Sequence, residues 1–375
     1  MGKVFFVKQN SYAQAEIDSA VKRVFDHFGG ISHFVKSGMR VLLKVNLVSG
    51  HDIERRVTTD PSIVRSVAKL VLDAGATPFI ADSPGIDSFH RAAEKAGFVQ
   101  LAQELGIECF ELTDPVDLPA SENATFKHIQ VSRQVLEADA VISLAKLKTH
   151  GQMYLTMGVK NLFGTIPGRL KAGWHYNVGL SREKFASLLL DIYAGVRPAF
   201  TLIDGVIGMD GDGPTSGDPY EFGLIGGCVD ALTMDFWLCR MLGAKLDEYP
   251  LYLAAKSKNL PQCSLNTDDV EGDFRPEHVF PNVNIPKTRS MRLLPRIPFI
   301  ERLMTSKPVH IPELCIGCGR CAAICAAKAL RHENRKLYFD YGKCIRCYCC
   351  HEMCPVKAIK FQESKLLKIV NLFTY

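Results

Sequence analysis

The chain has 375 residues, of which 47% are hydrophobic and 23% charged, and a formal net charge of +5 at pH 7. These values are ordinary for a soluble globular protein, and the length predicts two or three domains. No run of about 18 apolar residues predicts a membrane-spanning helix, and the first residues lack the pattern of a secretory leader. We therefore expect a cytoplasmic protein without a membrane span.

Short apolar segments alternate with helical segments over residues 1–260. The first, "KVFFVK", predicts a strand, and a helical segment follows from Tyr12. Further strands are expected at 40–47, 77–82, 107–112, 127–132, 140–146, 201–207 and 222–227. Helices are expected at 60–75, 155–163, 180–195, 230–243 and 247–257. Residues 88–106 are expected to form one helix or two short ones broken near Gly97. This alternation predicts a three-layer α/β domain with a mostly parallel sheet.

One helix start carries an explicit signal. Asp60 can cap the helix that follows, Pro61 suits the first helical position, and Gly75 suits the end.

The regular pattern stops near residue 261. Residues 261–305 are rich in Pro and Arg and have no steady period, so we interpret them as a linker that packs irregularly. A cysteine-rich module follows at 306–375. Its surplus of basic residues is not interleaved with aromatic ones, so we expect no nucleic-acid binding.

The cysteines are concentrated in two runs of the same rhythm. "CIGCGRCAAIC" begins at Cys315 and "CIRCYCCHEMC" begins at Cys344, and each places cysteines at i, i+3, i+6 and i+10. A secreted disulfide framework would be spread through a short chain, so this crowding favours metal ligation. Zinc is the alternative, but zinc sites usually pair two Cys-x-x-Cys knuckles over a longer gap.

The two runs resemble the bacterial two-cluster ferredoxin, a small α+β fold in which each run's fourth cysteine ligates the partner cluster. The resemblance implies two [4Fe–4S] clusters. One would take Cys315, Cys318, Cys321 and Cys354. The other would take Cys344, Cys347, Cys350 and Cys325. Cys349 interrupts the spacing and is expected to be a bystander, and Ala326 replaces the proline that usually follows the first run.

Segments of the large domain resemble the domain-of-unknown-function family numbered 362. They include "KVNLV" from residue 44, "DAGATPFIADSPG" from residue 73, "LAKLKTHGQMYLTMGVKNLFGTIPG" from residue 144 and "LIDGVIGMDGDGPTSGDP" from residue 202. The resemblance covers about residues 1–255. It implies an iron–sulfur protein of anaerobic metabolism and supplies no established reaction.

Cations and carboxylates lie where the predicted strands end. Lys146 and Lys148 share a face at the end of one strand and His150 turns with the loop that follows, and we expect these residues to bind or protonate a substrate there. Other strand ends and a glycine-punctuated segment are expected to add substrate-binding residues, namely Lys44, Asn46, Asp82, Lys160, Asn161 and Asp204. The alternative is a surface of solvated lysines.

These features predict an iron–sulfur redox protein in which a ferredoxin-like relay is fused to an α/β domain. The lysines would hold a small anionic substrate through charge-assisted hydrogen bonds, and His150 would exchange its proton. The protein would then be an iron–sulfur oxidoreductase. The alternative is a non-catalytic electron carrier or assembly factor that docks a redox partner protein.

Overall fold

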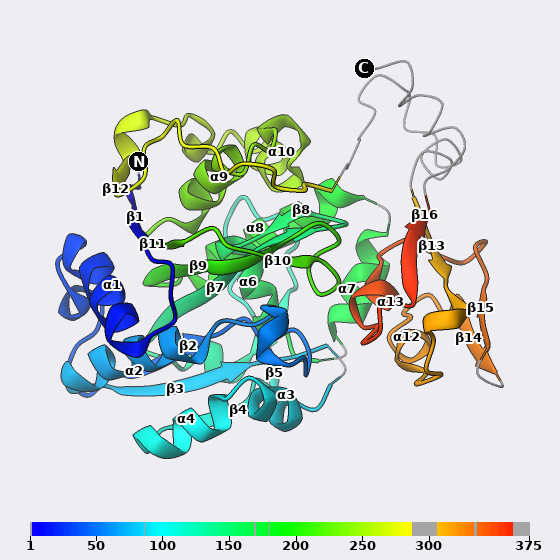
Figure 1. The fold of residues 1–375 in the computed structure, drawn as a ribbon, viewed down its shortest axis with the longest axis horizontal. Coiled ribbons are helices and arrows are strands. Elements are labelled where there is room, and N and C mark those ends of the chain that lie inside the picture. The colour runs from blue at the N-terminus through cyan, green and yellow to red at the C-terminus, as the bar shows by residue number, and fades with distance from the viewer. Residues whose placement is uncertain are drawn as a thin grey trace. The chain divides into compact units, whose positions relative to one another are not determined.

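The computed structural model describes residues 2–85, 87–168, 170–179, 181–286, 306–333 and 336–362. The chain forms two compact units, one of residues 1–171 with 182–287 and the other of residues 172–181 with 288–375 (Figure 1). Residues 261–286, which the sequence analysis assigned to the linker, belong to the first unit. The remainder of that predicted linker, 287–305, lies outside the described residues.

One large sheet organises the first unit. Among the described residues it has ten strands, in the order β12-β1-β11-β9-β7-β2-β3-β4, with β10 paired to β9 and β8 paired to β7. The strands are β1 (Val4–Lys8), β2 (Arg40–Lys44), β3 (Thr77–Asp82), β4 (Glu108–Glu111), β7 (Ala140–His150), β8 (Tyr154–Thr156), β9 (Phe200–Asp210), β10 (Asp218–Tyr220), β11 (Leu224–Cys228) and β12 (Val270–Gly272). A separate small pair is formed by β5 (Pro115–Asp117) and β6 (Gln130–Ser132).

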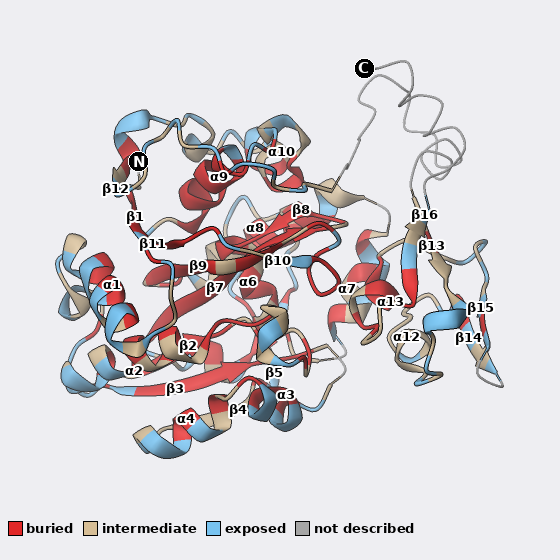
Figure 2. Cartoon of the chain, in the orientation of Figure 1, coloured by how far each residue is buried: buried red, intermediate tan, exposed pale blue. Residues whose placement is uncertain are grey.

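The central strands run parallel. β9, β7, β2, β3 and β4 pair in parallel with their neighbours, whereas β11 is antiparallel to both β9 and β1. Helices cover this sheet, and the strands β2, β3, β7 and β9 are buried almost throughout (Figure 2). The expected α/β class with a mostly parallel sheet is therefore confirmed.

The helices within residues 1–286 follow the predicted alternation. They are α1 (Gln14–His27), α2 (Pro61–Asp73), α3 (Phe89–Lys95), α4 (Phe98–Leu105), α5 (Arg133–Leu136), α6 (Gly158–Asn161), α7 (Leu170–Val178), α8 (Arg182–Val196), α9 (Ala231–Met241) and α10 (Pro250–Ser257). The Asp60 carboxylate accepts the backbone N–H of Ser62 at 3.0 Å, as its predicted cap role requires. The break near Gly97 is also present, and Gly97 adopts a φ of 75° that favours glycine.

Three segments differ from the prediction. The helix expected at 155–163 is only the short α6, because β8 pairs with the end of β7 before α6 begins. β7 and β9 also extend to His150 and Asp210, beyond their expected ends. In both strands the extension is paired with an antiparallel neighbour, β8 or β10, which supplies the backbone partners.

Among its described residues, the second unit contains residues 172–178 of α7, two strand pairs and two short helices. β13 (Lys307–His310) pairs with β16 (Ile359–Gln362), and β14 (Leu330–Glu333) pairs with β15 (Lys336–Phe339), both antiparallel. The helix α12 (Arg320–Ala323) lies within the first cysteine run, and α13 (Cys349–Glu352) lies within the second. This is the expected small α+β, ferredoxin-like module.

Among the described residues, no helix combines the length and the apolar character that crossing a bilayer requires.

Candidate functional site

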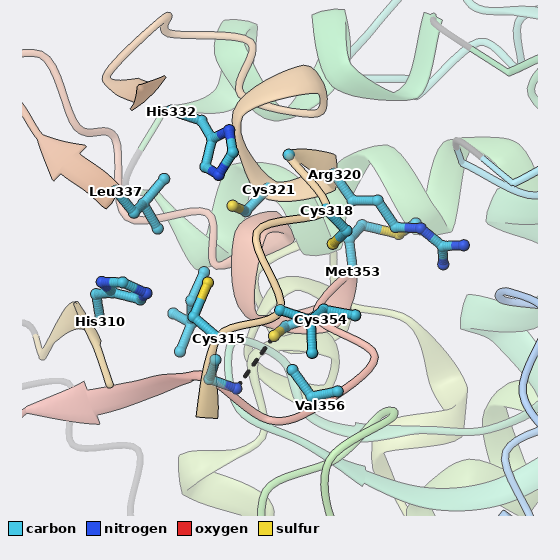
Figure 3. A pocket seen from close by; sticks show the side chains of 14 residues that line it. His310, Cys315, Cys318, Arg320, Cys321, His332, Leu337, Met353, Cys354 and Val356 are labelled. Carbon is cyan, nitrogen blue, oxygen red and sulfur yellow. Dashed lines mark hydrogen bonds between the residues drawn. The ribbon is translucent and has the colours of Figure 1, made fainter. Parts of the chain in front are cut away.

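The first of two cysteine pockets joins the two runs of the sequence. Its lining includes Cys315, Cys318 and Cys321 from the first run and Cys354 from the second (Figure 3). The pocket holds about 360 Å³ of space that no atom fills, open solvent included. The four thiols are those that the resemblance assigned to one cluster.

The second pocket has the reciprocal composition. Its lining includes Cys344, Cys347 and Cys350 from the second run and Cys325 from the first, around about 340 Å³. Cys349 lines this pocket as well, so the residue expected to be a bystander lies beside the four assigned thiols.

The local backbone repeats between the two runs. α12 begins after Gly319 and α13 begins after Tyr348, and both preceding residues are left-handed, with φ of 72° and 61°. The sulfur of Cys354 accepts the N–H of Ala358 at 3.1 Å, the bond dashed in Figure 3. The sulfur of Cys325 accepts the N–H of Ala329 at 3.2 Å in the same way. These N–H donors favour the thiolate that a metal requires.

Without a bound metal, burial favours the protonated form of several of these thiols. Burial raises the pKa of Cys321 to about 11, and burial also raises the pKa values of Cys325, Cys344 and Cys350. A thiol with a raised pKa becomes a ligand when a cation in the pocket takes the place of its proton. The residues present therefore fit a positively charged metal centre.

The thiols are not arranged for a single ion. A zinc site needs four ligands at about 2.0–2.3 Å from one metal. Among the described residues, no group of three or more His, Cys, Asp or Glu side chains is placed to hold one metal ion. Four thiols around each pocket fit a polynuclear iron–sulfur centre instead.

The predicted substrate residues gather at one place in the large sheet. β2 lies between β3 and β7, and the chain builds β3 and β4 on one side of it before returning to β7 on the other. Ligands of open α/β sheets bind outside the carboxyl ends of strands where the order reverses in this way. Lys44 ends β2, and Lys146 and Lys148 lie toward the end of β7.

The first ion pair joins β2 and β3. The Lys44 Nζ lies 2.9 Å from Asp82 Oδ1, and the two side chains are 0% and 4% exposed. Asp82 also accepts the backbone N–H groups of Leu47 and Ser83, both at 2.7 Å. Gly164 packs directly on this pair, since a Cβ there would lie 2.3 Å from Asp82 Oδ1. The backbone at Gly164 therefore helps to shield the Lys44–Asp82 pair from solvent.

A second ion pair joins β7 and β9. The Lys146 Nζ lies 2.7 Å from Asp204 Oδ2, and neither side chain is exposed. Burial lowers the pKa of Lys146, and the charge of Asp204 opposes that effect. The Tyr12 hydroxyl donates to Asp204 Oδ1 at 2.7 Å, and the Asp60 N–H donates to Asp204 Oδ2 at 2.9 Å.

Amide groups connect the Lys44–Asp82 pair to Lys148, which follows Lys146 on β7. The Lys148 Nζ donates to Asn46 Oδ1 at 2.8 Å and to the Val57 carbonyl at 2.7 Å. Asn46 donates to Asn161 Oδ1 at 3.2 Å, and Asn161 donates to the Lys44 carbonyl at 3.1 Å. The structure thus brings together seven of the predicted residues: Lys44, Asn46, Asp82, Lys146, Lys148, Asn161 and Asp204. We call this set the lysine network.

The other two predicted residues lie at its margins. His150 ends β7, is buried, and accepts the N–H groups of Gln152 and Met153 on Nδ1, both at 3.1 Å. A neutral His150 therefore carries its proton on Nε2. Lys160 lies in α6 and is partly exposed.

Burial excludes one alternative. Lys44, Lys146 and Lys148 are at most 1% exposed, so they are not the solvated surface lysines considered above.

Two further residues contact this region and were not predicted as site residues. Tyr12 bonds with Asp204 across 192 positions of sequence, a distance over which no spacing signal operates. Lys171 donates to the Ser83 carbonyl. Burial lowers the pKa of Lys171 to about 7. One sequence signal was available for Lys171 as a site residue, namely its position shortly after the glycines of 164–168.

The fold and the cysteine pockets define a class: an α/β domain joined to a 4Fe–4S ferredoxin-like module, with a role in electron transfer. Residues 41–240 match the family described as "Domain of unknown function (DUF362)", and residues 314–363 match the "4Fe-4S dicluster domain". The chain belongs to the DUF362 family.

A curated relative is similar over much of the chain. The "Thylakoid-associated protein sll1697" of Synechocystis sp. is 37% identical over 239 residues, which are 64% of this chain and 74% of that protein.

Two solved structures show a weak likeness. They are the lactate racemase apoprotein from Thermoanaerobacterium thermosaccharolyticum and a protein from Thermotoga maritima, with TM-scores of 0.40 and 0.39 and identities of 12% and 11%. The matches cover 63% and 67% of this chain, and the chain spans 56% and 60% of those two proteins.

Proposed function

We propose that this protein is an iron–sulfur redox protein whose C-terminal module holds two [4Fe–4S] clusters. Cys315, Cys318, Cys321 and Cys354 would hold one cluster, and Cys344, Cys347, Cys350 and Cys325 the other. The observation that carries the proposal is the exchange of the fourth cysteine, since each pocket takes three thiols from one run and one from the other. Such clusters accept and release single electrons.

The α/β domain is proposed to bind a small anionic substrate beside the lysine network, which would make the protein an oxidoreductase. The place of the network at the strand-order reversal supports this role. Lys148 and Lys160 would hold a carboxylate or phosphate group. His150 Nε2–H would donate a hydrogen bond to the substrate, because the Nδ1 atom already accepts two backbone N–H groups.

A second function is favoured by the ion pairs. Asp82 and Asp204 already balance Lys44 and Lys146, so these two lysines have less charge to offer a substrate. In this case the lysine network stabilises the sheet, and the protein acts as a non-catalytic electron carrier or assembly factor that docks a redox partner protein.

We further propose a cytoplasmic protein of anaerobic metabolism. Exposed [4Fe–4S] clusters with thiolate ligands suit a reducing compartment. The name of the Synechocystis relative points instead to a membrane-associated location. Fractionation of cells into membrane and supernatant, followed by immunodetection of the chain, separates the two locations.

The cluster proposal is tested on the full chain purified without oxygen. We expect about eight iron atoms and about eight acid-labile sulfides per chain, with an EPR signal on reduction. Zinc without sulfide would contradict the proposal.

The substrate proposal is tested by binding of inorganic phosphate and of acetate, measured by equilibrium dialysis. We expect Lys148→Met to weaken binding of one anion at least tenfold. The control is Lys245→Met, whose side chain is 79% exposed and far from this network in sequence. Equal binding by all three proteins would favour the carrier function.

A further inference from the structure

The two cysteine pockets are alike in their charged lining. Each is lined by four assigned cysteines and one arginine, Arg320 in the first and Arg346 in the second. Each also provides one backbone N–H to the sulfur of its exchanged cysteine. The remaining lining residues differ between the two pockets.

The difference is a pair of histidines. His310 of β13 and His332 of β14 line the first pocket, whereas the described lining of the second pocket contains no histidine. Both rings lie at the edge of the first pocket, together with Leu337 and Cys321 (Figure 3). Two separate strand pairs thus bring imidazole groups to one cluster site.

The histidines have unused hydrogen-bonding atoms. Nε2 of His310 and Nε2 of His332 are buried and have no hydrogen-bond partner among the described residues. A buried polar atom without a partner costs about 1–3 kcal/mol, so two in one pocket indicate an acceptor that is not part of the polypeptide. Sulfide and thiolate sulfur atoms are such acceptors.

We propose that His310 and His332 donate Nε2–H hydrogen bonds to the sulfur atoms of the cluster in the first pocket, and that these bonds make it the more easily reduced of the two clusters. The inference rests on the proposed cluster binding. Hydrogen bonds to sulfur stabilise the more negative, reduced cluster and raise its reduction potential. Electrons would then collect at the first pocket.

The state of His310 supports donation by a neutral ring. Burial lowers the pKa of His310, the charge of Glu313 opposes that effect, and the nearby His332 lowers the pKa further. A neutral His310 ring has one N–H, which matches its one unpartnered nitrogen.

The test is an EPR-monitored redox titration of the full chain with its clusters. In His310→Leu/His332→Leu, we expect the midpoint of the first cluster to fall. At the potential that half-reduces this cluster in the unmutated protein, the ratio of reduced to oxidised cluster should drop about tenfold, equivalent to about 59 mV for one electron. The second midpoint should stay unchanged. The midpoint lost in Cys318→Ala identifies the first cluster.

Two further variants separate hydrogen bonding from structural damage. His310→Gln/His332→Gln keeps an N–H donor on each side chain and should restore most of the midpoint. Tyr338→Leu alters the exposed face of β15 and should leave both midpoints unchanged, because Tyr338 is 48% exposed.

Three results would overturn the inference. They are unchanged midpoints in the double leucine variant, failure of the glutamine variant to restore the midpoint, and loss of about four iron atoms in the leucine variant. Iron and sulfide analysis of the unmutated chain comes first. If it finds no clusters, the proposed function fails, whereas intact clusters with unshifted midpoints defeat only this inference.

Discussion

The two units differ in whether the chain itself supplies charged partners for their reactive side chains. In the α/β unit, Lys44 and Lys146 are buried against Asp82 and Asp204, so the chain itself supplies each opposite charge. In the cysteine module, eight thiols line two pockets, and burial raises the pKa of several of them. In the first unit the chain thus supplies the opposite charge of two buried lysines, whereas we propose that the second unit depends on metal centres that bind from outside the chain.

The largest expected effect is the removal of iron. Chelation under anoxic conditions should abolish amide hydrogen-exchange protection in the strands of the module, β13 to β16, because the metal centres contribute much of its folding free energy. Protection in β2, β7 and β9 should persist. Hydrogen exchange with mass spectrometry measures both regions in one sample. Equal loss of amide protection in both units would contradict the proposed difference between them.

Next in size is the loss of one carboxylate from the lysine network. Asp204→Asn leaves the buried Lys146 without its opposite charge, so the free energy of unfolding should fall by about 3–5 kcal/mol. The double variant Lys146→Met/Asp204→Leu removes both charges and should be much less destabilised. Urea denaturation of the α/β unit measures each value, and a double variant as unstable as Asp204→Asn would contradict the electrostatic explanation.

A smaller effect is expected where backbone packs on the first ion pair. A Cβ at Gly164 would meet Asp82 Oδ1 at 2.3 Å and Lys44 Nζ at 2.5 Å, so Gly164→Ala should cost about 1–3 kcal/mol of unfolding free energy. Gly173→Ala is the matched control, because a Cβ there meets nothing within 4 Å. Urea denaturation should show the control unchanged or slightly stabilised.

The pH dependence of the unfolding free energy tests the effect of another buried lysine of the α/β unit, Lys171. Burial lowers the pKa of Lys171 from 10.5 to about 7 in the folded chain. Between about pH 7 and 10 the unfolded state holds a proton at Lys171 that the folded state lacks, so this residue makes stability rise with pH, by at most about 1.4 kcal/mol per unit. Below pH 7 both states are protonated and the contribution is constant.

Lys171→Met tests this sign. Its free energy of unfolding should rise less steeply than that of the unmutated chain between pH 7 and 10, as followed by urea denaturation at several pH values. Parallel pH profiles would show that Lys171 keeps an ordinary pKa in the folded protein.

The smallest effect is expected at Cys349. This thiol lines the second pocket but lies outside the proposed ligand set, so Cys349→Ser should leave the iron content unchanged. Cys350→Ser, one position along α13, should lose about four of about eight iron atoms. Iron analysis of the two variants compares neighbouring thiols directly, and equal losses would mean that Cys349 is a ligand.

Much of this protein could be predicted from residue patterns alone. The alternation of strands and helices predicted the α/β class, and the Asp60 cap and the break at Gly97 followed from local backbone chemistry that needs only a few neighbouring residues. The cysteine spacing, with the family resemblance, grouped the eight thiols as the two pockets do.

Only the tertiary structure decided what surrounds the predicted lysines. Strand-end positions placed Lys44 and Lys146 at one edge of the sheet, but their burial, their carboxylate partners and the contact of Tyr12 with Asp204 depend on which strands become neighbours. The attachment of β12 to β1, from a segment without a periodic pattern, depends on the same strand order. Short-range spacing determines turns, caps and metal-ligand runs, whereas the partner of a buried charge is chosen by packing between segments far apart in the chain.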